Sequence, residues 1–271
     1  MDSAVHKVWV AGQGGPRHGW TAERQTALVT GATSNIGRAI AAAFAAQGAR
    51  VVVSGRNADR GHAVVEEIRA TGRQADFVAA DLDGSARASR QLAAEATSVL
   101  GGRIDVLVNS AGIYPGSTTA ATDEATFDEV YAVNVKAPFF LTAAIAPVMA
   151  ERGNGAIINL ASWIARLGIP IGSLYSSTKG AIETLTRAWS AEFGPAGVRV
   201  NAISPGVVHE PSPDGEEHPG DVMMRGTPAG RSGTPGAIAH AAVYLASDEA
   251  AFVHGTVLDV DGGRVGVAVI S

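Results

Sequence analysis

The sequence predicts a single α/β domain, in which a doubly wound parallel sheet is covered by helices on both faces to give three layers. Three observations lead to this prediction. Short apolar runs with the length of buried strands alternate with amphipathic segments of helical length. Gly or Pro closes most of these segments. Residues with reactive or polar side chains directly follow the apolar runs, at the sheet edge where such folds bind ligands.

The first half of the chain carries four expected strands and three expected helices in alternation. The expected strands are 26–31, 49–55, 74–81 and 104–112. The expected helices between them are 37–48, 58–72 and 85–100. Gly48 and Gly72 end the first two helices, because glycine adopts the left-handed conformation in which many chains leave a helix. Strands that alternate with helices in this way are expected to run parallel.

The second half continues the alternation with one irregular interruption. A long helix is expected over 126–152, with bends near Pro138 and Pro147. The remaining expected strands are 155–162, 198–206 and 256–263, and the remaining helices are 173–194 and 234–247. The Pro-rich stretch 207–232 has neither period, and we expect it to form a lid over a substrate. No domain boundary interrupts 26–271, which is therefore expected to be one domain.

Residues 1–25 differ from the rest of the chain and are expected to form an N-terminal extension. Residues 5–10 have the composition of a short strand, and the Gly-rich run AGQGGPRHG follows them. Two interpretations stay open. The extension is either a loose arm or an arm that packs on a neighbouring subunit through Trp9 or Trp20.

Composition excludes several kinds of site and partner. The chain has 271 residues, a net charge of −5 and no long basic run, which argues against nucleic acid as a partner. It has no cysteine, and His209 and His218 on an irregular loop do not make a metal site, so no metal is expected. Without a long apolar run or a secretory signal, we expect a cytoplasmic protein that does not bind a membrane.

A Gly-rich turn, TGATSNIG, joins the first expected strand to the first helix. Gly31 and Gly37 allow a tight turn and a close approach of the backbone to a pyrophosphate, which rests on the helix N-terminus. The spacing departs from the usual G-x-G-x-x-G. A turn without a ligand therefore stays open as an alternative. The residues of this turn expected to bind a dinucleotide are Gly31, Thr33, Ser34, Asn35, Ile36 and Gly37.

The end of the second strand indicates which dinucleotide is bound. An acidic residue there would bind the ribose hydroxyls of NAD and repel a 2′-phosphate. This chain has Ser54, Gly55 and Arg56 instead, and a guanidinium makes charge-assisted contacts to phosphate. NADP(H) is therefore favoured over NAD(H). Asp81, with Leu82 beside it, ends the third strand and is expected either to accept a hydrogen bond from adenine or to cap the next helix.

Tyr175 and Lys179 are the residues most suggestive of catalysis. They lie four apart in a predicted helix and therefore on one face. An ammonium beside a phenol favours the phenolate and lowers the phenol pKa, which suits an acid or base in proton transfer. Ser162, which ends the strand 155–162, would hold a carbonyl oxygen nearby. The three predict proton transfer to or from a C–O group, as in the proton half of a hydride transfer.

These motifs together resemble the short-chain dehydrogenase/reductase family, over roughly 26–263. In family order they are TGATSNIG, ADL at 80–82, NSAG at 109–112, Asn134 in VNVKAPF, Ser162, YSSTK at 175–179, SPG at 204–206 and the final LDVDGG. The resemblance implies a Rossmann-like fold and an enzyme that moves a hydride between a nicotinamide cofactor and a CH–OH or C=O group. It also implies a homotetramer or homodimer, formed through the helices around 126–152 and 175–194.

The resemblance also implies a role for each matching residue. Tyr175 would be the acid or base on the substrate oxygen, which Ser162 would hold. Lys179 would bind the nicotinamide ribose and lower the pKa of Tyr175. Asn134 would maintain a bend in its helix and a water that relays protons; a core amide remains the alternative for Asn134, and a turn cap for Ser162. The further cofactor contacts that the resemblance implies are Asn109, Ala111, Gly112, Pro205, Gly206 and Val208.

Three positions depart from the family pattern. Asn35 replaces the middle glycine of the first turn, and we expect the turn to survive because Asn tolerates left-handed backbone. Ser110 replaces a more usual Asn. Glu210 stands near a position where a Thr often donates a hydrogen bond to the nicotinamide, which an ionised carboxylate cannot do. Glu210 therefore either weakens the cofactor contact or points elsewhere.

The expected substrate pocket is apolar and aromatic. Its candidate walls are Ile113, Tyr114, Trp163, Ile164, Leu167, Leu174 and the lid, together with Ser162 and Tyr175. Such walls predict a bulky substrate, cyclic or aromatic. We therefore expect an NADPH-dependent reductase of such a ketone, or the reverse secondary-alcohol dehydrogenase. An NAD-dependent dehydrogenase and a non-catalytic nucleotide-binding protein stay open as alternatives.

Overall fold

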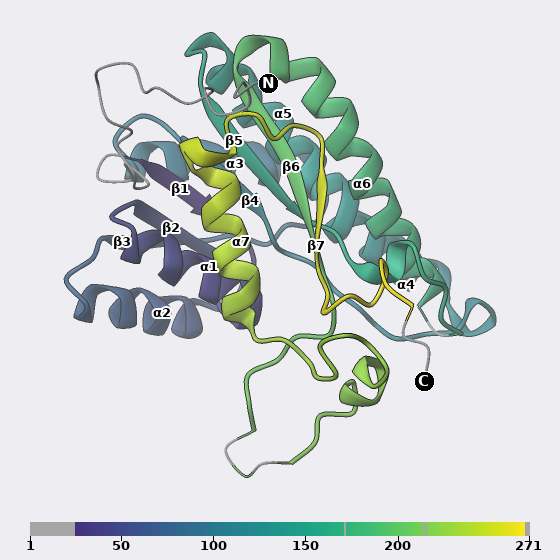
Figure 1. The fold of residues 1–271 in the computed structure, drawn as a ribbon. Helices are drawn as coiled ribbons and strands as arrows, with labels where there is room; N and C mark the ends of the chain where they lie inside the picture. Colours follow the sequence, from purple (N-terminus) through teal and green to yellow (C-terminus); the bar gives the residue numbers. More distant parts are fainter. Residues whose placement is uncertain (1–24, 171, 213, 215, 269–271) are drawn as a thin grey trace, which may run out of the picture.

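A computed structural model describes residues 25–170, 172–212, 214 and 216–268, so the predicted N-terminal extension lies outside the described part apart from Gln25. Within this part the chain forms a seven-stranded sheet in the order β3-β2-β1-β4-β5-β6-β7 (Figure 1). All paired strands run parallel. The strands are β1 (Thr26–Val29), β2 (Arg50–Gly55), β3 (Ala75–Ala79), β4 (Val106–Asn109), β5 (Gly155–Leu160), β6 (Val198–Pro205) and β7 (Val257–Val260).

Helices cover both faces of this sheet and bury its side chains in two cores. The helices are α1 (Asn35–Ala46), α2 (Ala58–Ala70), α3 (Ala86–Val99), α4 (Glu124–Tyr131), α5 (Ala137–Glu151), α6 (Ser173–Phe193) and α7 (Pro235–Ala246). Residues of α1, α2 and α7 build one core, and residues of α3, α5 and α6 build the other. Strand side chains alternate between them, so that Val29 enters the first core and Leu28 the second. The predicted three-layer α/β fold is confirmed.

The strand order reverses between β1 and β4, at the centre of the sheet. From β1 the chain builds outward to β2 and β3, and it then returns to add β4 to β7 on the other side. The loops that leave β1 and β4 therefore diverge and leave a crevice at the carboxyl edge of the strands. The expected strands end a few residues later than the observed ones, because their last residues already belong to these loops.

The long helix predicted over 126–152 is interrupted around Asn134, the residue for which the family resemblance implies a bend. A π turn, Ala132–Lys136, separates α4 from α5. The π turn ends two residues before Pro138, the second residue of α5, and α5 continues through Pro147. The irregular turn thus contains Asn134 and directly precedes Pro138.

The combined run Glu124–Glu151 is long and apolar enough, by length and composition alone, to cross a membrane. Its most apolar window is 44% buried inside the fold, and α5 packs against α3 and β5. Burial in the fold accounts for much of this apolar character, since a helix that packs on a sheet carries an apolar stripe.

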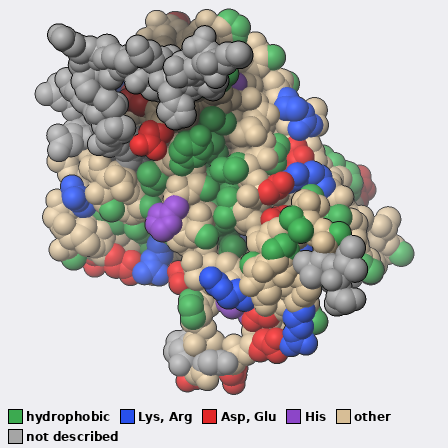
Figure 2. Space-filling view, in the orientation of Figure 1, with side chains coloured by type: hydrophobic (Ala, Val, Ile, Leu, Met, Phe, Trp, Pro, Cys, Tyr) green, Lys and Arg blue, Asp and Glu red, His purple; other side chains and the backbone are tan. Residues whose placement is uncertain are grey.

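The segment 207–232 projects from the body of the molecule between β6 and α7 (Figure 1). A parallel bridge between Val208 and Gly233 closes its base. Within it, Asp221–Met224 forms a short 3-10 helix. Charged side chains gather on this projection (Figure 2).

Candidate active site

A cleft of about 630 Å³ opens at the carboxyl edge of the sheet, at the reversal of strand order. It runs from the turn after β1, past the ends of β2, β3 and β4, to the segments that follow β5 and β6. Most of the residues predicted for the site meet here. Those that line the cleft are Gly31, Thr33, Ser34, Asn35, Ile36, Gly37, Ser54, Arg56, Asp81, Leu82, Ala111, Gly112, Ser162, Trp163, Tyr175, Lys179, Pro205, Gly206 and Val208.

The turn after β1 is packed too tightly for larger side chains. A Cβ at Gly37 would lie 2.3 Å from the carbonyl oxygen of Gly31, and one at Gly31 would lie 2.7 Å from the Cα of Ala111. Asn35 begins α1 with φ of 46°, and it is the one non-glycine residue with positive φ among the described residues. The turn therefore survives the replacement of glycine by asparagine, as predicted. The N-terminus of α1 consequently faces the cleft with its free backbone N–H groups.

The end of β2 supplies two guanidinium groups rather than one. Arg56 and Arg60 are exposed and both line the cleft, and neither side chain forms an ion pair with another described residue. Arg60 was missed by the sequence analysis, although it lies one helical turn after Arg56. Asn57 fixes the start of α2 between them, since its Oδ1 accepts a hydrogen bond of 2.9 Å from the backbone N of Arg60.

Two further side chains that line the cleft are Ser54 and Asp81. The Oγ of Ser54 is buried and has no hydrogen-bond partner among the described residues, although Ser54 lines the cleft. Asp81 also lines the cleft, and the following helix α3 is capped by Ser85, whose side chain accepts a hydrogen bond from Ala88. The alternative reading of Asp81 as a helix cap was therefore wrong.

Helix α6 places Tyr175 and Lys179 at the cleft. The Nζ of Lys179 donates a hydrogen bond of 2.8 Å to the carbonyl oxygen of Leu160, at the end of β5. It lies 5.4 Å from the centre of the Tyr175 ring. The helix thus brings the ammonium beside the phenol, as the four-residue spacing predicts, and β5 holds it there.

Burial sets the ionisation of this pair. It raises the pKa of Tyr175 to about 12, against an opposing effect of the Ser162 hydroxyl, which favours the phenolate by hydrogen bonding. It also lowers the pKa of Lys179 to about 8. The effect of burial on Tyr175 is thus opposite to the lowering that was expected from Lys179, which is not among the groups that shift this pKa here. At neutral pH Tyr175 is consequently a protonated phenol.

Asn134 lies beneath the cleft and connects three elements. Its Oδ1 accepts a hydrogen bond of 2.9 Å from the backbone N of Ile113, and its Nδ2 donates one of 3.0 Å to the carbonyl oxygen of the same residue. Nδ2 also lies 3.2 Å from the hydroxyl of Thr178 on α6. The π turn is what aims this amide at the loop after β4. Asn134 therefore acts in this structure as a buried bridge, and it does not line the cleft.

Asn109, a predicted cofactor contact, also lies below the cleft rather than on its wall. Its Nδ2 donates to the Oδ1 of Asn159 at 2.9 Å and lies 3.4 Å from the hydroxyl of Thr142. Its side chain thus joins β4 to β5 and α5. Glu210 is exposed and lies outside the cleft, so it points elsewhere, the second of the two outcomes expected for it.

Aromatic and apolar side chains form the substrate end of the cleft. The ring of Tyr114 packs against that of Tyr175 with 4.8 Å between centres, and Tyr114 is 47% exposed. Trp163 is almost buried, with the guanidinium of Arg264 over its ring. Leu167 and Leu174, two candidate walls, do not line the cleft. Lining residues that the sequence analysis did not name are Asn57, Arg60, Ala80, Val133, Leu160, Ala161, Ile169 and Met223.

Arg166 connects the segment that carries Ser162 to neighbouring strands and to α6. The hydroxyl of Ser162 makes no capping bond, which removes the cap alternative. Arg166 bonds to the carboxylate of Asp259 on β7 and donates to the hydroxyl of Ser204 at 3.0 Å. Its Nε lies 3.4 Å from Glu183 on α6. Arg166 therefore ties the Ser162 turn to β6, to β7 and to the helix of Tyr175, a link that no sequence pattern indicated.

Comparisons with known proteins agree with this site. A family model described as Enoyl-(Acyl carrier protein) reductase matches residues 31–264. The chain is 42% identical to galactitol 2-dehydrogenase (L-tagatose-forming) of Cereibacter sphaeroides, over 88% of this chain and 93% of that protein. It is 38% identical to 2,5-dichloro-2,5-cyclohexadiene-1,4-diol dehydrogenase of Sphingobium indicum, over 90% and 97%.

A solved structure with the same fold is that of gluconate 5-dehydrogenase from Burkholderia cenocepacia in complex with NADP and tartrate. It superposes with a TM-score of 0.81 at 30% identity, over 91% of this chain and 98% of that one. The match extends over the sheet, the cleft and the helix of Tyr175 and Lys179 alike. The chain therefore belongs to the short-chain dehydrogenase/reductase family and is an oxidoreductase that acts on alcohol or ketone groups.

Proposed function

We propose that this protein is an NADPH-dependent reductase of a bulky, cyclic or aromatic ketone. The observation that carries the choice of cofactor is the pair of guanidinium groups, Arg56 and Arg60, at the end of β2. A 2′-phosphate between two arginines would be bound by charge-assisted hydrogen bonds, and the missing carboxylate would leave it unopposed. The NADP in the structure of the Burkholderia relative supports this choice.

The other residues of the cleft fit a dinucleotide. The N-terminus of α1 suits a pyrophosphate, and the glycines of the turn leave room for it to approach the backbone. The unpartnered hydroxyl of Ser54 is buried at the place where a ribose or its phosphate would lie. Lys179, whose Nζ already faces the cleft, would hold the hydroxyls of the second ribose.

In the proposed reaction the bound nicotinamide supplies the hydride, and the chain supplies the proton and the positioning. Ser162 would hold the ketone oxygen by donating a hydrogen bond. Tyr175, protonated because of its raised pKa, would donate its proton to that oxygen as negative charge develops. Lys179 would stabilise the phenolate that remains. As the family resemblance implies, Asn134 would hold a water that reprotonates Tyr175; its side-chain amide bonds to the backbone of Ile113.

The protonated state of Tyr175 favours reduction as the direction. A phenol is ready to donate a proton to a developing alkoxide, whereas dehydrogenation needs the phenolate. The walls Tyr114, Trp163, Ile164 and Met223 suit a ring or a branched apolar group. The galactitol relative supports a second candidate, the oxidation of a sugar alcohol, since that protein is named for such a reaction.

We also propose that the protein is a homotetramer or homodimer. Phe127, Phe139 and Val148 are large apolar side chains on α4 and α5 that are 42 to 47% exposed. A second copy placed over these helices would remove them from water. Light scattering on the purified protein tests this proposal, and a monomer at micromolar concentration would contradict it.

Titration with NADPH and NADH, followed by nicotinamide fluorescence, tests the cofactor. We expect tighter binding of NADPH, and we expect Arg56→Asp to weaken NADPH roughly 10- to 100-fold while NADH changes little. Arg90→Asp is the matched control, because it makes the same change of charge on the exposed face of α3, outside the cleft. Preference for NADH in the wild-type protein would contradict the proposal and favour an NAD-dependent dehydrogenase.

A comparison of substrates then separates the two candidate reactions. Turnover of a bicyclic ketone with NADPH is expected to exceed turnover of a ketohexose, and the reverse order would favour the sugar-alcohol reaction. Binding of the cofactor with turnover of neither ketone would contradict both candidate substrate classes.

A further inference from the structure

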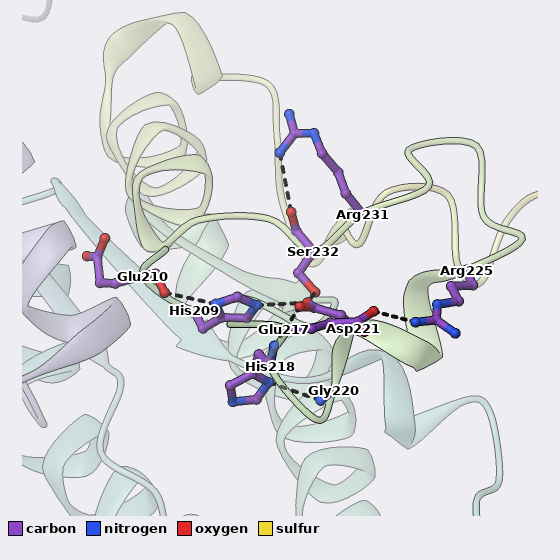
Figure 3. A network of polar contacts seen from close by, with 9 residues as sticks. All are labelled: His209, Glu210, Glu217, His218, Gly220, Asp221, Arg225, Arg231 and Ser232. Atoms are coloured by element: carbon purple, nitrogen blue, oxygen red, sulfur yellow. Dashed lines mark hydrogen bonds and ion pairs between the residues drawn. The ribbon is translucent and has the colours of Figure 1, made fainter. Parts of the chain in front are cut away.

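Asp221, at the start of the 3-10 helix in the projecting segment, receives hydrogen bonds from three separate parts of that segment (Figure 3). The Nε2 of His209 lies 2.8 Å from its Oδ1, and the hydroxyl of Ser232 donates to the same oxygen. The backbone N of His218 donates to Oδ2 at 2.9 Å. One carboxylate thus joins the beginning, the middle and the end of the segment.

The geometry of His209 suits a charge pair at this junction. Its Nε2 faces the carboxylate of Asp221, and its Nδ1 lies 2.9 Å from the carbonyl oxygen of Glu210. Both partners accept hydrogen bonds only, so the doubly protonated imidazolium, which donates from both nitrogens, satisfies both contacts. Hydrogen bonding to Asp221 correspondingly raises the pKa of His209.

His218 completes the junction by ring stacking. Its Nδ1 accepts a hydrogen bond of 3.0 Å from the backbone N of Gly220, and its ring stacks on that of His209 with 4.4 Å between centres. Asp221 and His218 are the titratable side chains that face His209 among the described residues.

The junction lies directly above the base of the segment. The backbone N of His209 donates to Gly233, and the backbone N of Gly233 donates to Val207. Asp221 therefore ties the 3-10 helix to a base that is already fixed to β6 and α7. The helix in turn carries Met223 into the cleft, where Val207 and Val208 of the base also lie.

We propose that Asp221 is a positioning residue for the substrate, because it holds the turn that places Met223 against the alcohol or ketone. It acts through His209 and Ser232 and touches no reacting atom. The part of the proposal that concerns substrate rests on the proposed function, whereas the attachment of the turn stands on the contacts alone.

Asp221→Asn tests this proposal, with Glu217→Gln as the matched control. Glu217 is an exposed carboxylate in the same segment, paired with Arg225 outside the cleft. We expect Asp221→Asn to raise KM for the ketone roughly tenfold, which corresponds to weakening of hydrogen bonds to a charged group. We expect kcat and NADPH binding to change less than about twofold, since the reacting groups are untouched.

Trypsin supplies a readout that does not depend on activity. Arg231 lies between the 3-10 helix and Ser232, so release of that helix should speed cleavage there, as followed by peptide mapping at native pH. Cleavage at Arg225 is left out of the comparison, because Arg225 pairs with the control position Glu217. We expect faster cleavage in Asp221→Asn and wild-type cleavage in Glu217→Gln. Unchanged cleavage in Asp221→Asn overturns the proposal, and so does accelerated cleavage with an unchanged KM.

A pH profile distinguishes the charge pair from a merely structural contact. In the wild-type protein, KM should rise as the pH increases through the raised pKa of His209, because the imidazolium is lost. His209→Gln keeps a neutral donor near Asp221, so its KM should be independent of pH over the same range. A wild-type protein that turns over no ketone would refute the proposed function alone, and the cleavage comparison would still decide whether Asp221 holds the turn.

Discussion

Two pairs of titratable side chains differ in what sets their ionisation: one lines the cleft and the other lies on the projecting segment. Tyr175 and Lys179 line the cleft and are buried there, and loss of hydration raises the pKa of the phenol to about 12 and lowers that of the ammonium to about 8. His209 and Asp221 lie on the projecting segment, where mutual hydrogen bonding raises the pKa of His209, and bonds from Ser232 and His209 lower that of Asp221 to about 2. Burial favours the neutral forms in the first pair, and hydrogen bonding favours the charged forms in the second.

This difference in what sets the pKa values separates the pair proposed to act in the reaction from the pair proposed to position a segment. A neutral phenol in a poorly hydrated place is an acid that releases its proton only when charge develops beside it. A charged pair in contact with water is screened, and it contributes more to the local shape of a segment than to the stability of the whole fold. Substitution of Tyr175 or Lys179 should therefore cause large changes in rate or in global stability. Substitution of His209 or Asp221 should cause local changes in the projecting segment.

The largest expected effect is on turnover after removal of one hydroxyl. Tyr175→Phe should lower kcat about 10²- to 10⁴-fold, because the proton donor is lost. NADPH binding should stay within a few-fold of wild type, as measured by nicotinamide fluorescence. Tyr244→Phe, on the outer side of α7, is the control and should retain full activity. Loss of cofactor binding in Tyr175→Phe would instead assign the tyrosine a structural part and favour a non-catalytic protein.

The next effect concerns global stability and follows from the buried ammonium. Because its pKa is lowered from 10.5 to about 8, the unfolded chain binds more protons than the folded chain between these pH values. The free energy of unfolding should therefore rise with pH across that window, by about 3 kcal/mol for this group alone. Tyr175 acts in the opposite sense at higher pH, since its raised pKa makes stability fall as pH increases above about 10.

Urea unfolding from pH 8 to 10.5 measures this effect as a difference between two proteins. Lys179→Met keeps an apolar chain of similar length and removes the titration, so the rise assigned to Lys179 should be absent from its profile. Parallel profiles for the two proteins would show that Lys179 is hydrated in the native state. The comparison with His209 and Asp221 would then be wrong, because burial would not set the ionisation of Lys179.

The sequence predicted the elements more completely than the interactions between them. The alternation of apolar runs and helices depends on local periodicity, and every expected strand and helix is present within the described residues. Asn35 could be predicted as left-handed because that preference belongs to the residue itself. A bend at Asn134 was implied by the family resemblance alone; no local pattern predicts the π turn, because the amide of Asn134 is held by partners at Ile113 and Thr178, far away in the sequence.

The ionisation of Tyr175 and Lys179 shows the same limit of prediction from sequence. The spacing of Tyr175 and Lys179 correctly places them together, but their pKa values depend on burial by the whole fold, which raises that of Tyr175 and which no spacing predicts. Asp221 lies 12 residues after His209 and 11 before Ser232 in a stretch without periodicity. No pattern relates three such positions, so this junction is visible only in the folded chain.

The smallest expected effect comes from the exposed ion pair of the projecting segment. It tests whether exposed charges act only locally. Glu217 and Arg225 pair with side chains that are 60 and 64% exposed. Glu217→Gln should change the free energy of unfolding by less than about 0.5 kcal/mol, as measured by urea unfolding, because solvent screens such pairs and ordering two long side chains offsets the attraction. Adding salt should change the free energy of unfolding equally in the wild-type protein and in the variant. A larger loss, removed by salt, would show that charges on the projecting segment stabilise the whole molecule, and the division between a buried catalytic pair and a locally acting exposed one would have to be abandoned.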